Sequence, residues 1–195
     1  MSESSGVDKL IGGCALIASL AAVFIAWDQG RVMRAQQHGE VYPVLQVEGF
    51  VASKEGQVEV GLRVSNNGVG PALIEAVDLA LDGVQITNLQ SLLTDLPAPS
   101  SDSWSSLAGR AMAPGEQVEA LSLRWQGEAL TDAHVAAIDA FTERASDWDL
   151  RICYCSVFQR CWETSRTGTA RADRVQRCEQ RDTDVFSDFG SRVSR

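Results

Sequence analysis

Residues 58–83 read VEVGLRVSNNGVGPALIEAVDLALDG, and this stretch decides the predicted fold because it holds two alternating segments joined by a turn. Every second residue from Val58 to Val64 is apolar, which is the pattern of a β-strand with one buried face. The alternation resumes after the turn, over residues 73–81. The stretch therefore predicts two neighbouring strands of a sheet.

The turn between these strands has the sequence SNNGVGPA, residues 65–72. Asn67 and Gly68 are residues that adopt a positive φ at low cost, Gly70 adds further freedom, and Pro71 stiffens the exit from the turn. We therefore interpret Asn67, Gly68, Gly70 and Pro71 as turn-forming residues rather than as a ligand-binding loop.

Further strands are predicted on both sides of this pair. They cover residues 44–52, 118–125, 149–157 and 160–166. A helix is predicted from a cap at Thr131 or Asp132 to about residue 146. About seven short strands with Gly and Pro turns predict a mainly β fold, an Ig-like antiparallel β-sandwich with one inserted helix.

Two parts of this pattern resemble a known class of proteins. The stretch 58–83 and MAPGEQVEALSLRW, residues 112–125, are similar to Ig-like modules of bacterial surface proteins. The wider layout resembles uncharacterised bacterial single-pass membrane proteins that carry an N-terminal helix, a polar stalk, an N-N-G-x-G-P-A turn and a late hairpin such as YCSVFQRCW. The resemblance implies a fold and a bacterial membrane, and it implies no activity.

The N-terminal segment reads LIGGCALIASLAAVFIAW over residues 10–27, without a charged side chain. A helix of this length spans roughly 27 Å, which is close to the thickness of a bilayer's hydrocarbon core. The predicted organisation is a tail (1–9), a transmembrane helix (10–27), a juxtamembrane helical stalk (28–39), a β-sandwich domain (40–166) and a loosely held, polar, Arg-rich tail (167–195).

The apolar segment has three other interpretations besides an uncleaved anchor, and the sequence disfavours each of them. A signal peptide could be cleaved near Ser19-Leu20-Ala21, but the apolar run continues beyond that site. IGGC, residues 11–14, has only a short apolar stretch before it for a lipoprotein signal. A buried soluble helix is disfavoured by the uncharged length. The uncleaved anchor is the preferred prediction, and its principal partner is the lipid bilayer.

The anchor also carries small residues at spacings of three and four. They are Gly12, Ala15, Ser19, Ala22 and Ala26. Such a face allows two helix backbones to approach closely, so these residues are candidates for packing against another membrane protein or a second copy of the chain.

Three cysteines lie close together in RICYCSVFQRC, residues 151–161, and a fourth follows at Cys178. Cys153 and Cys155 share one face of a strand at a spacing too long for a relaxed disulfide between them. A hairpin loop with an odd number of residues places Cys155 opposite Cys161 and Tyr154 opposite Trp162. An even loop would place Cys161 opposite Ser156 instead. The odd loop is preferred because it satisfies both faces of the hairpin, and it predicts the disulfides Cys155–Cys161 and Cys153–Cys178.

Free thiols in a reducing compartment and a four-cysteine metal site remain alternatives. The spacing C-x-C-x5-C-x16-C differs from that of common structural zinc sites. Lys9 before the anchor and Arg31 and Arg34 after it lean slightly toward a cytoplasmic domain. Disulfides favour an oxidising compartment. The cysteines are the stronger evidence because the charge difference is only a single arginine. The sequence therefore predicts a single-pass protein of the bacterial inner membrane with a periplasmic C-terminal domain.

Catalytic motifs are scarce. The only histidines are His38 and His134, and no G-x-S-x-G elbow, phosphate loop or H-E-x-x-H motif accompanies them. The net charge of −9 disfavours a general nucleic-acid binder. We therefore expect no enzyme activity, no cofactor and no nucleic-acid partner.

The leading hypothesis is a non-enzymatic interaction or accessory module, anchored in the membrane and exposed outside the cytoplasm. The alternatives are a thiol- or metal-dependent four-cysteine protein and a small subunit of a membrane complex.

Overall fold

The computed structural model describes residues 4–81, 83–144, 148–164 and 167–187. The chain divides into two units, a helix that ends at Glu40 and a domain that begins at Val41. The outermost residues of the predicted N-terminal tail (1–3) and of the predicted C-terminal tail (188–195) lie outside the described residues, as do the end of the predicted helix near residue 146 and residues 165–166 at the predicted domain boundary.

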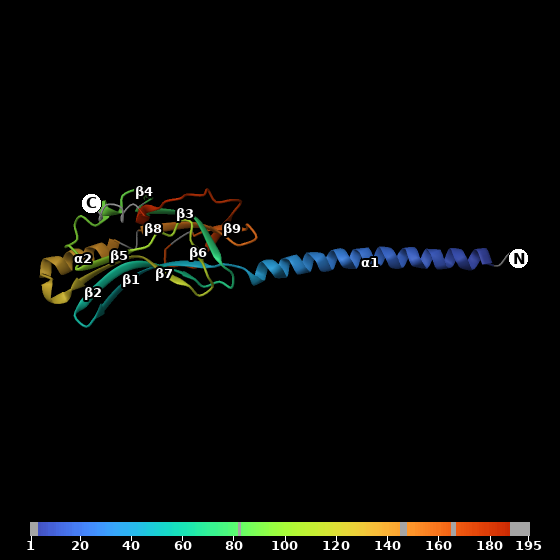
Figure 1. Ribbon diagram of the computed structural model, residues 1–195, viewed down its shortest axis with the longest axis horizontal. Coiled ribbons are helices and arrows are strands. Elements are labelled where there is room, and N and C mark those ends of the chain that lie inside the picture. The colour runs from blue at the N-terminus through green and yellow to red at the C-terminus, as the bar shows by residue number, and fades with distance from the viewer. Residues whose placement is uncertain (1–3, 82, 145–147, 165–166, 188–195) are drawn as a thin grey trace. The chain divides into compact units, whose positions relative to one another are not determined.

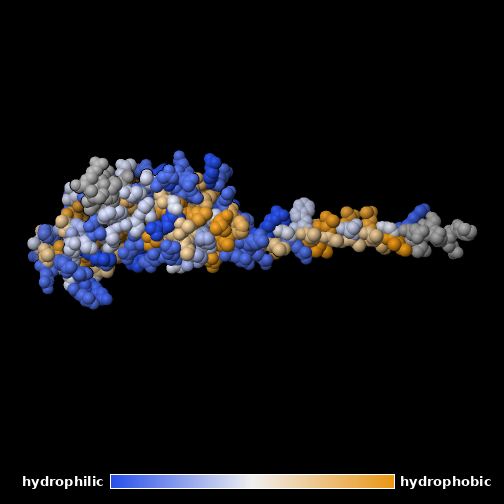
Figure 2. Space-filling view, viewed as in Figure 1, coloured by the Kyte–Doolittle hydropathy of each residue, from blue (hydrophilic) through white to orange (hydrophobic). Residues whose placement is uncertain are grey.

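The first unit is the helix α1 (Ser4–Glu40), drawn in blue in Figure 1. The predicted stalk, residues 28–39, is a continuation of the same helix rather than a separate element. Residues Lys9–Glu40 are long and apolar enough to cross a membrane by length and composition. Figure 2 shows apolar residues along α1 with hydrophilic residues on either side of them, and large apolar side chains there are exposed, such as Leu16 and Phe24.

The second unit contains the described strands, two short 3₁₀ helices and the helix α2 (Asp132–Arg144). The strands are β1 (Leu45–Lys54), β2 (Gln57–Asn66), β3 (Ala72–Leu81), β4 (Val84–Ile86), β5 (Ser101–Trp104), β6 (Ala111–Met112), β7 (Gln117–Gln126), β8 (Trp148–Cys155), β9 (Cys161–Thr164) and β10 (Ala172–Val175). The 3₁₀ helices are η1 (Leu89–Leu92) and η2 (Gly127–Ala129).

The described strands form two antiparallel sheets, which lie as two layers (Figure 1). Sheet A has the order β1-β2-β7-β5, and sheet B has the order β10-β9-β8-β3-β4, with β6 paired to one end of β3. Across the sheets these correspond to strands A, B, E and D of an Ig domain facing strands G, F, C and C′, with β10 added beside G. The predicted Ig-like sandwich with one inserted helix is confirmed.

The core lies between the sheets and is made by the alternate residues that period-two patterning indicated. Val60, Leu62 and Val64 of β2 face it from sheet A, and Ile152 and Tyr154 of β8 face it from sheet B. Because each strand contributes apolar residues at every second position, the two sheets close over one apolar layer.

Asn66, at the end of β2, holds together the turn between β2 and β3. Its side chain is buried, and all four of its hydrogen-bonding positions are used. Nδ2 donates to the carbonyl oxygens of Gly70 (2.8 Å) and Met112 (3.1 Å). Oδ1 accepts the N–H groups of Val44 (3.2 Å) and Gly68 (3.1 Å). One amide side chain thus joins the entry segment 41–44, the turn and β6.

The reason for the glycines in this turn differs from the predicted one. Neither Asn67, Gly68 nor Gly70 has a positive φ. Instead, a Cβ on Gly68 would overlap the carbonyl oxygen of Tyr42, and a Cβ on Gly70 would overlap the backbone of Val41. The turn residues are therefore selected by the close approach of the entry segment and not by left-handed backbone conformation.

The C-terminal part of the chain also differs from the prediction of a loosely held tail over 167–195. Residues Ala172–Val175 form β10 and pair with β9. Val185 and Phe186 join the main core, where Phe186 has no exposed surface. The folded domain therefore extends well beyond residue 166, because this polar segment contributes a strand to sheet B and two apolar side chains to the core.

We predict that Asn66→Ala lowers the free energy of unfolding by about 3 kcal/mol or more, because it leaves several buried backbone groups without partners. The neighbouring Asn67→Ala is the matched control. Asn67 is exposed, its side chain donates to the Gln46 side chain, and its backbone bond to Val44 is kept in the variant, so the loss of stability should stay within about 0.5 kcal/mol. Chemical denaturation of the full chain in detergent measures both, and equal losses would contradict this role of Asn66.

Candidate functional site

The β8–β9 hairpin has the register that the cysteine pattern predicts. Cys155 lies opposite Cys161, and Tyr154 lies opposite Trp162 on the other face. The two aromatic rings stack in the core with centroids 5.9 Å apart, and burial raises the pKa of Tyr154 to about 12. The hairpin therefore separates an aromatic pair, which faces sheet A, from a cysteine pair, which faces outward.

Two disulfides form on the outward face of sheet B. Cys155 pairs with Cys161 across the hairpin, with Cα atoms 4.0 Å apart, and Cys153 pairs with Cys178, with Cα atoms 5.7 Å apart. These are the two pairings expected from the spacing. Neither disulfide joins sheet A to sheet B, so the two sheets are held together without a covalent link between them.

The two disulfides touch each other. The Sγ atoms of Cys155 and Cys178, which belong to different disulfides, lie 3.8 Å apart. The sulfurs of Cys155, Cys161 and Cys178 all lie within 4.8 Å of one another. Ala76 of β3 and Val175 of β10 pack around them. We call these four cysteines the cysteine cluster; each is at most 9% exposed.

Residues 176–187, which we call the strap, cross the outward face of sheet B. The strap leaves β10 at one edge, bonds Cys153 of β8 through Cys178, and reaches β3 on the far side. There the N–H group of Arg181 donates to the carbonyl oxygen of Glu75 (2.8 Å), and its guanidinium pairs with Asp78. The strap thus covers the cysteine cluster as a partial third layer.

Asp184 ends the crossing. One carboxylate oxygen accepts the backbone N–H groups of Leu107 (2.7 Å) and Ala108 (2.8 Å) in the loop before β6. The other accepts the N–H groups of Phe186 (3.1 Å) and Ser187 (2.9 Å) and so caps the helical turn that starts at Val185. A single carboxylate therefore fixes both the strap and the loop.

The electrostatics of Asp184 follow from these contacts. Burial of the carboxyl opposes its ionisation, but the N–H groups of Ala108, Ser187 and Leu107 outweigh burial and hold the pKa of Asp184 below its ordinary value. The group is therefore a carboxylate at neutral pH, where it is stabilised by the backbone rather than by a basic side chain.

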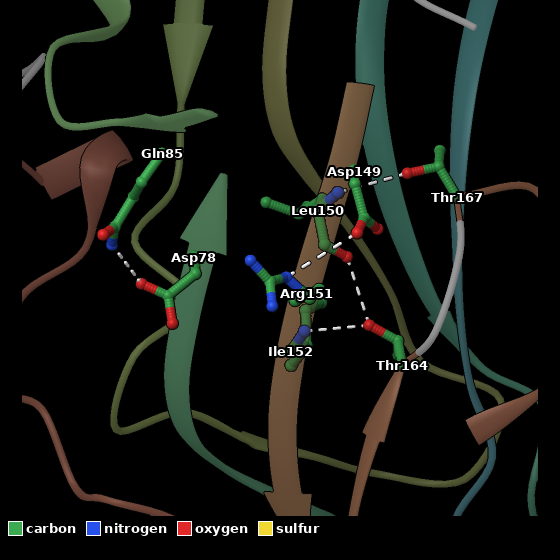
Figure 3. Close-up of polar contacts among 8 residues, drawn as sticks. All are labelled: Asp78, Gln85, Asp149, Leu150, Arg151, Ile152, Thr164 and Thr167. Atoms are coloured by element: carbon green, nitrogen blue, oxygen red, sulfur yellow. Dashed lines mark hydrogen bonds and ion pairs between the residues drawn. The ribbon is translucent and has the colours of Figure 1, made fainter. Parts of the chain in front are cut away.

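Two threonine hydroxyls form hydrogen bonds with the backbone of β8 on the side that pairs with β9, as Figure 3 shows. The hydroxyl of Thr164 accepts the N–H group of Ile152 (2.8 Å) and donates to the carbonyl oxygen of Leu150 (3.1 Å). The Thr167 hydroxyl accepts the N–H group of Leu150 (3.2 Å). These hydroxyls replace backbone partners where the pairing between β8 and β9 ends.

A groove runs beside the cysteine cluster, between the hairpin tip and the strap. Cys155, Cys161 and Cys178 line it, together with the polar residues Ser156 and Gln159. Three charged residues also line the groove, the basic Arg177 and the acidic Glu75 and Glu179. The cluster is therefore covered by the strap but reachable from solvent along one side.

A separate apolar cavity of about 340 Å³ lies at the inner face of sheet A. Its walls include Val60, Leu62 and Leu123, with Phe141 of α2 and Trp148 of β8 opposite them. The two rings meet edge to face with centroids 5.0 Å apart. The described residues that line this cavity include no acidic, basic, histidine or cysteine side chain, so the cavity offers room for an apolar group.

The other predicted residues belong to α1 and α2. Gly12, Ala15, Ser19, Ala22 and Ala26 share one face of α1 and are exposed. The hydroxyl of Ser19 donates to the carbonyl oxygen of Leu16 in the same helix (2.8 Å). Cys14, also on α1, forms no disulfide. His134 lies in the first turn of α2, where its backbone N–H group donates to the Thr131 hydroxyl.

Asp184 and Phe186 were missed by the sequence reasoning. The available signal was an Asp directly before an apolar pair, a common start of a capped helical turn. Comparison of the chain with protein-family models, with curated proteins and with solved structures found no match. The resemblance to bacterial membrane-anchored Ig-like proteins therefore remains a hypothesis.

Asp184→Asn should lower the free energy of unfolding by about 2 kcal/mol at neutral pH, because it weakens several charge-assisted hydrogen bonds. The pKa of Asp184 is lower in the folded than in the unfolded chain, so the contribution of Asp184 to stability is complete above about pH 5. It is lost as the pH falls through the folded value. Thermal unfolding at several pH values should show the gap between wild type and variant narrowing below about pH 4.

The exposed Asp182 in the same strap provides the control, and Asp182→Asn should leave stability within about 0.5 kcal/mol. A gap between wild type and Asp184→Asn that is as wide at pH 3 as at pH 7 would contradict the ionised role of this carboxyl.

Thr164→Val should lower the free energy of unfolding by about 2 to 4 kcal/mol, because the buried N–H of Ile152 and carbonyl of Leu150 both lose their partner. Thr164→Ser keeps the hydroxyl and removes only a methyl group, which costs about 1 kcal/mol. Denaturant titration compares the two variants, and a loss in Thr164→Ser as large as that in Thr164→Val would show that the hydroxyl is not responsible.

Proposed function

We propose that this protein is a single-pass membrane protein that presents an Ig-like domain outside the cytoplasm as a non-enzymatic interaction or accessory module. In this proposal α1 is the anchor, the membrane is the bacterial inner membrane, and the domain lies in the periplasm. The observation that supports it most is the combination of an exposed apolar helix with a domain whose strap is fastened by two disulfides.

The disulfides support the extracytoplasmic side of the membrane. The Cys153–Cys178 bond closes the longer of the two loops, and constraining a loop of this size stabilises a fold by about 3.5 kcal/mol in the chain-entropy account. Such bonds persist in oxidising compartments and are rare in a reducing cytosol. This argument outweighs the small difference in basic residues around the anchor.

The non-enzymatic assignment rests on what the described residues bring together. The described residues that line the apolar cavity include no titratable side chain, and both oxygens of Asp184 are occupied by backbone N–H and serine hydroxyl donors. An Ig-like sandwich offers loops and sheet edges for binding, and its cavity adds a place for an apolar group of a ligand or partner.

The grouping of sulfurs favours one alternative, a four-cysteine metal protein. Three sulfurs within 4.8 Å of one another, with Cys153 bonded to one of them, are close enough to surround one thiophilic ion after reduction. This second candidate requires the domain to reside in a reducing compartment.

Alkaline phosphatase and a green fluorescent protein, each fused after Arg195 in separate bacterial strains, test the orientation. We expect an active phosphatase and a dark fluorescent fusion, because α1 should carry the C-terminal domain across the membrane. Deletion of residues 10–27 is the matched control and should abolish the phosphatase signal. A bright fluorescent fusion with an inactive phosphatase would contradict the proposal.

Counting thiols on the same membrane-extracted protein separates the two candidates. After denaturation without reductant, a maleimide should label only Cys14, whereas all five cysteines should react after reduction. Labelling of all five without reductant, together with one equivalent of bound zinc, would instead support the metal protein.

A further inference from the structure

The two disulfides are placed so that one can react with the other. The sulfur of Cys155 lies 3.8 Å from that of Cys178, a distance at which two non-bonded sulfurs are already in contact. Cys155 is bonded to Cys161, and Cys178 is bonded to Cys153. A thiolate released at Cys155 would therefore be formed next to a sulfur of the second disulfide.

Three of the four cysteines lie at the wall of the groove, and each of these three is at most 8% exposed. Cys155, Cys161 and Cys178 line the groove beside the strap, whereas Cys153 does not line it. A second hollow beside Cys161 is lined by Arg160 and Arg174. Basic side chains near a cysteine stabilise its thiolate and attract an incoming one, so this side of the cluster suits attack by an anionic sulfur.

We propose that the four cysteines form one thiol–disulfide exchange site, whose substrate is a thiolate of a small molecule or of another protein. This role goes beyond the proposed interaction function: it adds a redox activity that replaces the non-enzymatic part of that proposal, and it does not depend on the interaction role. The substrate thiolate attacks the sulfur of Cys161, forming a mixed disulfide and releasing Cys155 as a thiolate. Cys155 then attacks Cys178, which forms the Cys155–Cys178 bond and releases Cys153 as a thiolate that takes up a proton.

A second substrate thiolate completes the reaction. It attacks the substrate sulfur of the mixed disulfide, which releases an oxidised substrate disulfide and leaves Cys161 as a thiol. Two substrate thiols have then been oxidised, and the protein has taken up their two electrons. Its two disulfides have become one Cys155–Cys178 disulfide and the two thiols of Cys153 and Cys161.

The position of Cys178 gives this sequence a structural consequence. Cys178 is bonded to β8 before the exchange through Cys153 and after it through Cys155, which is on the same strand face. The strap therefore stays covalently attached throughout, and the Asp184 contacts need not open. The site can accept electrons without losing the third layer of the fold.

Limited reduction of the full-length protein in detergent tests the proposal directly. The oxidised protein is treated with a small amount of glutathione, the free thiols are blocked with N-ethylmaleimide, and peptides are mapped by tandem mass spectrometry. Fragmentation at Tyr154 distinguishes Cys153 from Cys155. We expect more than half of the single-disulfide protein to carry the Cys155–Cys178 bond, with Cys153 and Cys161 blocked.

The opposite outcome is equally clear. If the single-disulfide protein carries only Cys153–Cys178 with Cys155 and Cys161 blocked, the second disulfide does not receive the thiolate and the proposal is wrong. The same holds if glutathione reduces neither bond while the protein remains folded. This result leaves the proposed membrane topology and interaction role untouched, because structural disulfides serve both.

Two single substitutions provide a matched pair that needs no added reductant. Cys161→Ser leaves Cys155 as a free thiol beside the Cys153–Cys178 bond, and we expect part of the protein to convert to Cys155–Cys178 with Cys153 blocked by maleimide. Cys155→Ser removes the attacking sulfur and should retain Cys153–Cys178. Equal release of Cys153 in the two variants would overturn the route through Cys155.

Discussion

The outward face of sheet B near the β8–β9 hairpin is apolar, and this constraint shapes the rest of the domain. From residue 152 to residue 155, β8 is buried on both faces. One face meets sheet A through Tyr154, and the other carries cysteines against Ala76. A strand with two buried faces needs cover on both sides. The strap supplies the second cover. The Cys153–Cys178 disulfide holds the strap in place, although the strap has few apolar side chains of its own.

The two ends of the folded domain are fixed in related ways. At the entry, Asn66 binds backbone groups of the segment that follows α1, and the glycines after it let that segment approach. At the exit, Asp184 binds backbone groups of the loop before β6 and of its own helical turn. In both places one short polar side chain satisfies several buried backbone groups that no strand partner reaches. Because both contacts meet β6 or its loop, this short strand links the beginning of the domain to its end.

The sequence predicted those parts of the fold that repeat. Alternation located the long strands of both sheets, and the Cys, Tyr and Trp positions set the hairpin register, because a two-residue period leaves few registers that satisfy both faces. It did not predict the strap, since Val185 and Phe186 are an isolated apolar pair without a period. It identified the glycines of the first turn for the wrong reason, because the segment they approach lies more than twenty residues earlier in the chain. Asn66 was passed over for Asn67, and nothing local distinguishes two adjacent asparagines of which one is buried.

One disulfide is enough to fasten the strap to the domain, so the second disulfide needs a separate explanation. A single bond from Cys178 to β8 would fasten the strap, yet the hairpin bond between Cys155 and Cys161 constrains only a short loop and contributes about 2.4 kcal/mol in the chain-entropy account. Its contribution to stability is therefore the smaller of the two. What the hairpin bond adds is a sulfur pair that stands in the groove and touches the bond beneath the strap. Stability alone would be served by placing the two bonds far apart, where they would constrain different loops. In the proposed exchange this contact lets a bond pass from one disulfide to the other, and the strap can remain in place because Cys178 meets both cysteines of the same strand face.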